Sequence, residues 1–153
     1  MDIRDLYQST IIDHSRHPRH CVALTAPSCC AHGKNPLCGD EVSIFLNIEN
    51  GKVQDVGFSG SGCAISVAST SLMLDAIKGK AVTDVETLFE KFHALLTEEN
   101  TEVEDLGKLQ VFAGVKEFPA RVKCATLPWH TLQAALAHSA QTVSTEGEND
   151  DES

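Results

Sequence analysis

The sequence has no long apolar run and little positive charge. No stretch approaches the ~20 apolar residues that a membrane-crossing helix needs, and residues 1–5 are acidic and amphipathic rather than an apolar leader. Lysine and arginine total 12 against 22 acidic residues, so the formal net charge is −10, which disfavours contact with nucleic-acid phosphates. We therefore expect a cytoplasmic protein that binds neither membrane nor nucleic acid.

The chain also has no internal repeats and no excess of charged residues. Hydrophobic residues make up 42% of its 153 residues and charged residues 22%, which is ordinary for one domain with a real core. After residue 139 the composition shifts to Ser, Thr, Gly, Glu and Asp, without a basic residue. We therefore predict a domain over 1–139 and an acidic, disordered tail over 140–153. The five acids in 98–105 are interpreted as solvated surface.

The first half of the chain changes from helical to strand periodicity. Apolar residues at helical spacing predict a helix over 3–14, and residues 21–35 have the composition of a loop. From 41 to 58 apolar and polar residues alternate on both sides of Asn50-Gly51, the strongest short signal for a β-hairpin. The sequence therefore predicts a hairpin in the middle of the domain.

The second half is typical of helices. Patterns rich in Ala, Leu and aromatic residues predict helices over 64–77, 85–96 and 103–113, and a last one that starts at 118–119 and runs through Leu136. The predicted fold class is α+β, with one small antiparallel sheet of about three strands packed against several helices.

Three of the six cysteines lie in settings suited to metal or sulfur chemistry. The first is Cys38 in Cys38-Gly39-Asp40. Residues i and i+2 of an extended chain point the same way, so this thiol and this carboxylate can meet at one ion. The alternative for this motif alone is a buried cysteine before an aspartate that caps the hairpin.

The second thiol, Cys63, follows Gly60-Ser61-Gly62 and begins an apolar helical pattern. The dipole of a helix stabilises a thiolate at its N-terminus. A flexible turn that ends in a buried thiol would have the same sequence, so this motif does not decide between the two.

The third thiol, Cys124, lies beside Arg121 and Lys123 at the start of the last helix. Three thiolates and one carboxylate supply the four ligands of a tetrahedral Zn²⁺, with a net charge of about 2 − 4 = −2 that neighbouring cations offset. Iron–sulfur clusters also use thiolates. A core-facing cysteine with solvated basic neighbours is the alternative. The other three cysteines, in 21–30, are interpreted as incidental: Cys21, Cys29 and Cys30.

Taken together, the motifs resemble the SufU branch of the iron–sulfur cluster assembly proteins related to IscU and the NifU amino-terminal domain. The collinear segments cover about residues 3–138 and are these: Leu6-Tyr7 to His17-Pro18-Arg19, Asn35-Pro36-x-Cys38-Gly39-Asp40, Gly60-x-Gly62-Cys63-x-Ile65-Ser66, Lys78-Gly79-Lys80, and Phe118-Pro119-Ala120-Arg121-Val122-Lys123-Cys124. The resemblance implies a SufE/NifU-like α+β fold.

Two features of the sequence favour the SufU branch. The scaffold type usually has histidine directly before the third cysteine, where this chain has Lys123. The gap from Cys63 to Cys124 is 124 − 63 = 61 positions, which fits the insertion of SufU-like proteins, here within about 82–114. The resemblance then implies a zinc ion held by four residues: Cys38, Asp40, Cys63 and Cys124.

The resemblance also implies a role in sulfur transfer. A SufS-type cysteine desulfurase would supply persulfide sulfur, Cys38 would accept it, and Arg121 and Lys123 would support anionic sulfur, before passage to downstream cluster-assembly proteins. Two alternatives stay open: a scaffold that builds a [2Fe–2S] cluster, and a structural zinc domain that acts as an adaptor.

Overall fold

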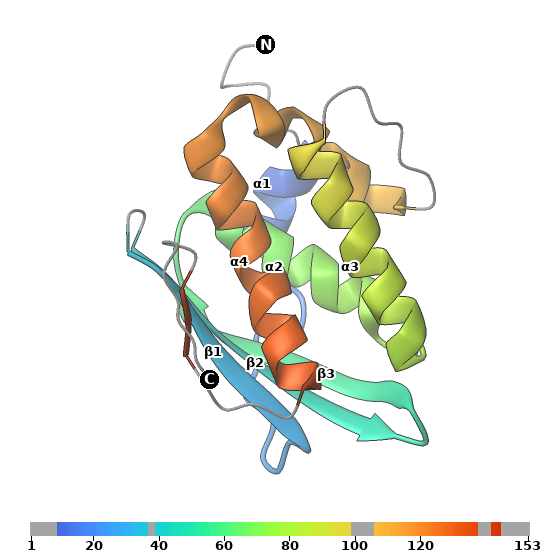
Figure 1. The fold of residues 1–153 in the computed structure, drawn as a ribbon. Coiled ribbons are helices and arrows are strands. Elements are labelled where there is room, and N and C mark those ends of the chain that lie inside the picture. The colour runs from blue at the N-terminus through green and yellow to red at the C-terminus, as the bar shows by residue number, and fades with distance from the viewer. Residues whose placement is uncertain (1–8, 37–38, 99–105, 138–141, 145–153) are drawn as a thin grey trace.

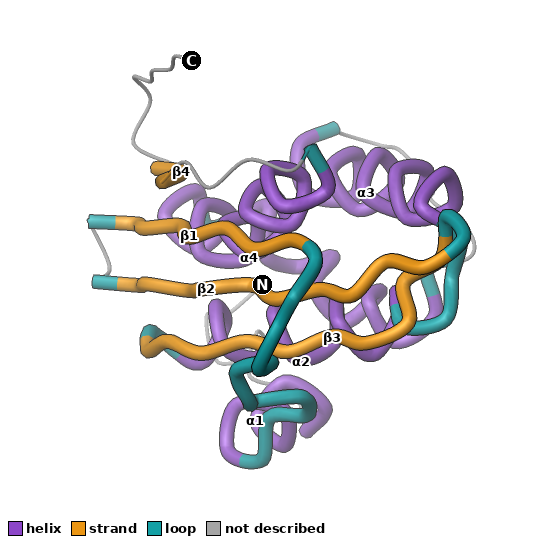
Figure 2. The backbone as a smooth tube through the Cα atoms, turned by 90° about the horizontal axis from the view of Figure 1, so that it is seen from below, coloured by secondary structure: helices purple, strands orange, loops and turns teal. Residues whose placement is uncertain are grey.

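The computed structural model describes residues 9–36, 39–98, 106–137 and 142–144, and it has the predicted α+β architecture. Three antiparallel strands, β1 (Cys29–Asn35), β2 (Asp40–Glu49) and β3 (Lys52–Ser61), form most of one sheet. The helices α2 (Ala64–Ile77), α3 (Val82–Thr97) and α4 (Pro119–Leu136) lie over one face of the sheet, as Figures 1 and 2 show from two directions. The predicted fold class is confirmed.

The hairpin predicted in the middle of the chain is β2–β3. Asn50 and Gly51 form its turn with φ angles of 55° and 75°, both in the left-handed region. Such angles give a two-residue turn whose twist matches that of the strands, which explains why Asn-Gly stands here. The inward side chains of β2 are Asp40, Val42, Ile44 and Leu46, so the carboxylate that opens the strand shares the face of the core.

One strand falls where we predicted a loop. Residues 21–28 have no regular structure, but β1 occupies 29–35 and pairs antiparallel with β2, from Cys29 opposite Leu46 to Asn35 opposite Asp40. Its inward positions are small or polar: Cys29, Ala31, Gly33 and Asn35. The prediction was wrong because this strand lacks the bulky β-branched residues that mark most strands.

The small residues of β1 let α4 pack closely against it. A Cβ atom at Gly33 would collide with the side chain of Thr131 and press on Leu127, both on α4. Only glycine fits at this crossing, because there is no room for a Cβ atom. Asn35 lies two residues further along the strand and Cys124 seven residues back along the helix, so the crossing brings these two side chains to the same end of the sheet.

The last predicted helix and the first long one are tied together in the core. Trp129 of α4 is fully buried, stacks on Phe92 of α3 and donates from Nε1 to Ser69 Oγ on α2 at 3.2 Å. Ser69 Oγ in turn donates to the carbonyl of Ala125 at 2.6 Å. These contacts fix α2 against α4 directly beside Cys124 and six residues after Cys63.

Helix α1 (Ser9–Arg16) packs on α2 and is anchored there by a buried histidine. His14 Nδ1 lies 2.7 Å from Ser71 Oγ, which also accepts from the backbone N–H of Arg19 at 2.8 Å. Burial, and to a smaller degree the charge of Arg19, lowers the pKa of His14 below its usual 6.5. The predicted helix over 3–14 thus continues to Arg16, while residues 1–8 lie outside the described residues.

Two further expectations are modified. The helix predicted over 103–113 is a 3₁₀ helix, η2 (Gly107–Glu117), and residues 99–105 lie outside the described residues. Within the segment predicted to be a disordered tail, β4 (Thr142–Ser144) pairs parallel with β1 and gives the sheet order β3-β2-β1-β4. In the described part of the chain, no helix is long and apolar enough to cross a membrane.

Candidate metal centre

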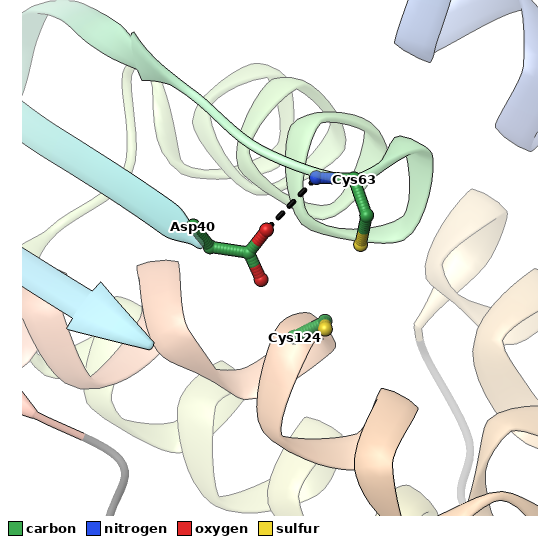
Figure 3. A group of neighbouring side chains, drawn as sticks. All are labelled: Asp40, Cys63 and Cys124. Atoms are coloured by element: carbon green, nitrogen blue, oxygen red, sulfur yellow. Dashed lines mark hydrogen bonds between the residues drawn. The ribbon is translucent and has the colours of Figure 1, made fainter. Parts of the chain in front are cut away.

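Three of the four predicted ligands come together at one end of the sheet. Asp40 opens β2, Cys63 precedes α2, and Cys124 lies in the second turn of α4. One oxygen or sulfur atom of each lies within 4.8 Å of the other two, and the three side chains point toward a common centre in Figure 3. Residues far apart in the sequence therefore form one cluster.

Asp40 is held by the turn that precedes α2. It is only 1% exposed, and its Oδ1 accepts from the backbone N–H of Cys63 at 2.8 Å. A Cβ atom at Gly62 would touch this same oxygen, which is why the residue before Cys63 has no side chain. The other oxygen, Oδ2, is buried without a hydrogen-bond partner among the described residues. An unpaired buried carboxylate oxygen is costly unless a ligand satisfies it.

Cys63 occupies the N-cap position of α2. Its Sγ accepts from the N–H of Ser66 at 3.5 Å, in the way that a serine or aspartate side chain caps a helix. A hydrogen bond from the thiol of Cys124, together with that N–H, lowers the pKa of Cys63 from 9.0 to about 6, although burial and the charge of Asp40 act in the opposite direction. Cys63 is thus prepared to be a thiolate at neutral pH.

Cys124 is fully buried and has polar contacts on two sides. Its Sγ accepts from Asn35 Nδ2 at 3.6 Å and lies at the same distance from the carbonyl oxygen of Ala120, which is an alternative to Cys63 as acceptor of the one thiol proton. The close crossing of β1 and α4 at Gly33 sets the first of these contacts. A cysteine that only filled the core would not have an amide donor directed at its sulfur.

The cluster fits a zinc ion. With Zn–S bonds of about 2.3 Å, two sulfurs in a tetrahedral site lie about 3.8 Å apart, so ligand atoms within 4.8 Å need to move by less than about 1 Å each. Two thiols, a carboxylate oxygen without a partner and an adjacent cysteine in the sequence make up a donor set of the type that Zn²⁺ prefers.

The remaining site predictions have different outcomes. Cys38, predicted as fourth ligand and acceptor, lies outside the described residues. Arg121 and Lys123 stand on α4, half-buried, within one turn before Cys124. The three cysteines set aside as incidental are not part of the cluster: Cys21 is exposed, Cys29 faces the core from β1, and Cys30 is half-buried on the other face of that strand.

Sequence reasoning assigned no role to Asn35, which contacts the cluster directly. The residue was noted only as part of a motif, because the segment that contains it was predicted to be a loop. Alternation of Cys29, Ala31, Gly33 and Asn35 as a strand would have placed this amide on the inner face, beside Asp40.

A small α+β domain with a buried cysteine–carboxylate cluster has the form of a candidate thiolate metal site. The chain matches the NifU-like N terminal domain over residues 6–125, and it belongs to this family. Two relatives that are named as iron–sulfur cluster assembly scaffold proteins are each 37% identical to this chain, over 139 and 136 residues.

Relatives with two kinds of names match nearly the whole chain. The zinc-dependent sulfurtransferase SufU of Bacillus subtilis is 38% identical over 133 residues, covering 86% of this chain and 90% of the relative. The iron–sulfur cluster assembly scaffold protein IscU of Streptococcus pyogenes is 37% identical over 139 residues, covering 90% of this chain and 87% of the relative. Sequence similarity therefore places the chain in the IscU/SufU group without separating the two activities.

Solved structures agree with the fold. The putative cluster assembly scaffold protein for the SUF system from Fervidobacterium islandicum superimposes with a TM-score of 0.82 at 34% identity, covering 88% of this chain and 99% of the other. A NifU-like protein from Brucella abortus gives the same TM-score at 22% identity, covering 89% of this chain and 95% of the other, and supports the fold alone.

Proposed function

We propose that this protein is a zinc-dependent sulfur acceptor, which takes sulfur from the persulfide of a SufS-type cysteine desulfurase for iron–sulfur cluster assembly in the cytoplasm. The observation that carries the proposal is the convergence of Asp40, Cys63 and Cys124 into one cluster, with a buried carboxylate oxygen that no described residue pairs with. Zinc would be held by these three residues and Cys38. Bound zinc keeps thiolates deprotonated at neutral pH.

The sequence around Cys124 favours the sulfur acceptor over the scaffold. Lysine stands at position 123, directly before the third cysteine, so that position supplies no imidazole ligand to a cluster. The match to a relative named as a zinc-dependent sulfurtransferase covers 86% of this chain and supports the same reading.

Cys38 is the proposed acceptor because the other two thiols of the proposed site are firmly held. Cys63 caps a helix and Cys124 is enclosed in the core, so both are poorly placed to leave the metal and meet a second protein. Cys38 belongs to the segment that joins β1 to β2. On this proposal a ligand from the desulfurase, such as a histidine, replaces Cys38 while Cys38 reacts.

The transfer is a thiol–disulfide type of exchange and needs no external oxidant or reductant. The Cys38 thiolate attacks the terminal sulfur of the desulfurase persulfide, a bond from Cys38 Sγ to that sulfur forms, and the S–S bond of the desulfurase breaks. The desulfurase cysteine leaves as a thiolate, while Cys38 carries the persulfide with the terminal proton. Arg121 and Lys123 would offset the negative charge of the thiolate-rich site.

The decisive experiment measures desulfurase turnover and the position of the transferred sulfur. Zinc-loaded protein should stimulate alanine formation by the desulfurase, and alkylation followed by peptide mass spectrometry should find the added sulfur on Cys38. Cys38→Ala should abolish both, whereas Cys21→Ala, which alters an exposed thiol outside the cluster, should change neither. Turnover without sulfur on any cysteine of this chain would refute the proposal.

The scaffold activity remains the second candidate, since a relative that matches 90% of this chain is named as a scaffold. Anaerobic purification separates the two. A scaffold should reconstitute a stable brown cluster, and a zinc-dependent acceptor should be colourless with one zinc per chain. Brown protein without zinc would favour the scaffold and overturn the acceptor.

A further inference from the structure

Asn35 is an amide placed where packing alone would favour an apolar side chain. It ends β1 on the inner face of the sheet, opposite Asp40, and is fully buried. Its Nδ2 donates to Cys124 Sγ, while its Oδ1 has no hydrogen-bond partner among the described residues. Because no described residue pairs with this buried oxygen, the amide costs stability within that part of the chain that an apolar side chain would not cost. The benefit must therefore come from the donor half of the side chain.

The contact with Cys124 is of the kind that survives loss of the thiol proton. As a thiol, Cys124 donates to the carbonyl of Ala120 or to Cys63 and accepts from Asn35. As a thiolate it can no longer donate to either, because it has no proton. The N–H of Asn35 remains favourable and becomes a charge-assisted hydrogen bond. The contact therefore persists in the metal-binding form, whereas the two contacts in which Cys124 donates do not.

The two thiols of the cluster, Cys63 and Cys124, each receive an N–H donor, but from different sources. Cys63 receives the backbone N–H of Ser66, which belongs to the helix it caps. Cys124 is enclosed within α4, where backbone N–H groups are used by the helix, so its donor has to come from another element. Asn35 is the side chain that supplies it across the β1–α4 crossing.

We propose that Asn35 is a positioning residue that holds Cys124 on the zinc and lowers the nucleophilicity of its sulfur, so that Cys124 stays a ligand and does not become a sulfur acceptor. An N–H donor withdraws charge from a metal-bound thiolate and fixes its direction. This inference rests on the proposed zinc site and extends it, because it names a residue that would keep Cys124 on the metal while Cys38 exchanges.

The test uses Asn35→Leu, which keeps the branched shape and the number of side-chain heavy atoms and removes both polar atoms. In the metal-free protein this variant should unfold at the same or a higher temperature than the unchanged chain, because the unpaired oxygen is gone. In the zinc-loaded protein it should lose metal to a chelator about 10–100-fold faster. With cobalt in place of zinc, the sulfur-to-metal charge-transfer bands should shift. A residue that served packing alone would not produce these opposite effects.

The reactivity of the Cys124 sulfur is measured separately, by alkylating the zinc-loaded protein and mapping the modified peptides. In Asn35→Leu the share of label on Cys124 should rise. Asn47→Leu is the matched control, since Asn47 lies on β2 and its amide contacts Asp55 and Ser28 rather than the cluster. It should leave zinc release, the cobalt spectrum and Cys124 labelling unchanged.

Two results would overturn the inference. One is that Asn35→Leu, folded, releases zinc and labels at Cys124 as the unchanged chain does. The other is that Asn47→Leu produces the same changes as Asn35→Leu. If leucine prevents folding, Asn35→Ala, which cannot overfill the site, is measured by the same criteria. Failure of the unchanged chain to bind zinc would instead refute the proposed function, so the two failures are distinct.

Discussion

Asp40 has two roles in the proposed site, and two substitutions separate them. Its Oδ1 accepts from the N–H of Cys63, and its Oδ2 is the atom left for a metal. Asp40→Asn can keep the first contact through its remaining oxygen but replaces the second oxygen by an N–H₂ group, which does not bind zinc. Asp40→Ala removes both. The comparison therefore distinguishes a ligand from a residue that only caps the turn before α2.

The metal-free proteins report the structural role. A hydrogen bond to a charged group contributes about 1.5–3 kcal/mol, and leaving its partner unpaired in a buried site adds to the loss. For a chain of about 150 residues, 1 kcal/mol shifts the melting temperature by about 2–4 °C. Asp40→Ala should therefore melt about 3–12 °C lower than the unchanged chain, while Asp40→Asn should stay within about 3 °C.

Zinc reports the ligand role. At a free concentration 1,000 times the dissociation constant, a ligand that binds only the folded state adds about 4.1 kcal/mol to the free energy of unfolding. Asp40→Asn should bind zinc at least about 100-fold more weakly, because loss of even a hydrogen-bond partner of a metal ligand can change affinity that much. At the same zinc concentration, zinc should then add only about 1.4 kcal/mol to the free energy of unfolding of this variant.

Differential scanning calorimetry with and without zinc gives both quantities, and isothermal titration gives the affinities. The reasoning fails if Asp40→Asn gains as much stability from zinc as the unchanged chain does. In that case the carboxylate is a turn cap, and the unpaired Oδ2 has another explanation.

Three further predictions concern other parts of the structure. Gly33→Ala should push α4 away from β1 and lower the free energy of unfolding, measured in urea, by about 1–3 kcal/mol. Adding Thr131→Ala should recover part of this loss, and no recovery would contradict the close packing of Gly33 against Thr131. In the metal-free protein, the rate of Cys63 alkylation should rise with a midpoint near pH 6 rather than 9, and a midpoint near 9 would exclude the hydrogen bond from Cys124. The pKa of His14 in the folded state lies below 6.5, so the unfolded chain binds a proton at His14 more readily than the folded chain does. The contribution of His14 to stability is therefore complete above pH 6.5 and is lost as pH falls toward the folded-state pKa. His14→Gln should reduce this slope in urea titrations at several pH values, and an unchanged slope would assign it to other groups.

The sequence predicted the elements whose signals are local. Asn50-Gly51 marked the β2–β3 turn because few other residue pairs adopt its left-handed angles, and the helix predicted over 64–77 coincides with α2. Strand β1 was missed, because its inward residues are chosen for the close approach of α4, a constraint that arises only when the chain is folded. The same long-range crossing hid the role of Asn35.

The candidate site shows the same division. The motifs identified Asp40, Cys63 and Cys124 individually, each with an ordinary structural alternative. Two observations favour a shared site over those separate structural alternatives: the three ligand atoms lie within 4.8 Å of one another, and Oδ2 of Asp40 has no partner among the described residues. Neither can be predicted from local spacing. The assignment of Cys38 as acceptor remains a prediction, because that residue lies outside the part of the chain that the structure describes.

The distance along the chain between the members of the cluster has a consequence for biosynthesis. Cys124 follows Asp40 by 124 − 40 = 84 residues, so at a synthesis rate of about 5–20 residues per second it is made roughly 4–17 seconds later. During that interval a nascent chain has the carboxylate and, from residue 63 on, Cys63, but it lacks the sulfur of Cys124. On the proposed function, tight zinc binding would have to wait until α4 has been made and has packed against β1. A chain that held the metal would then have completed the long-range part of its folding, so metal content would report on folding as well as on the site.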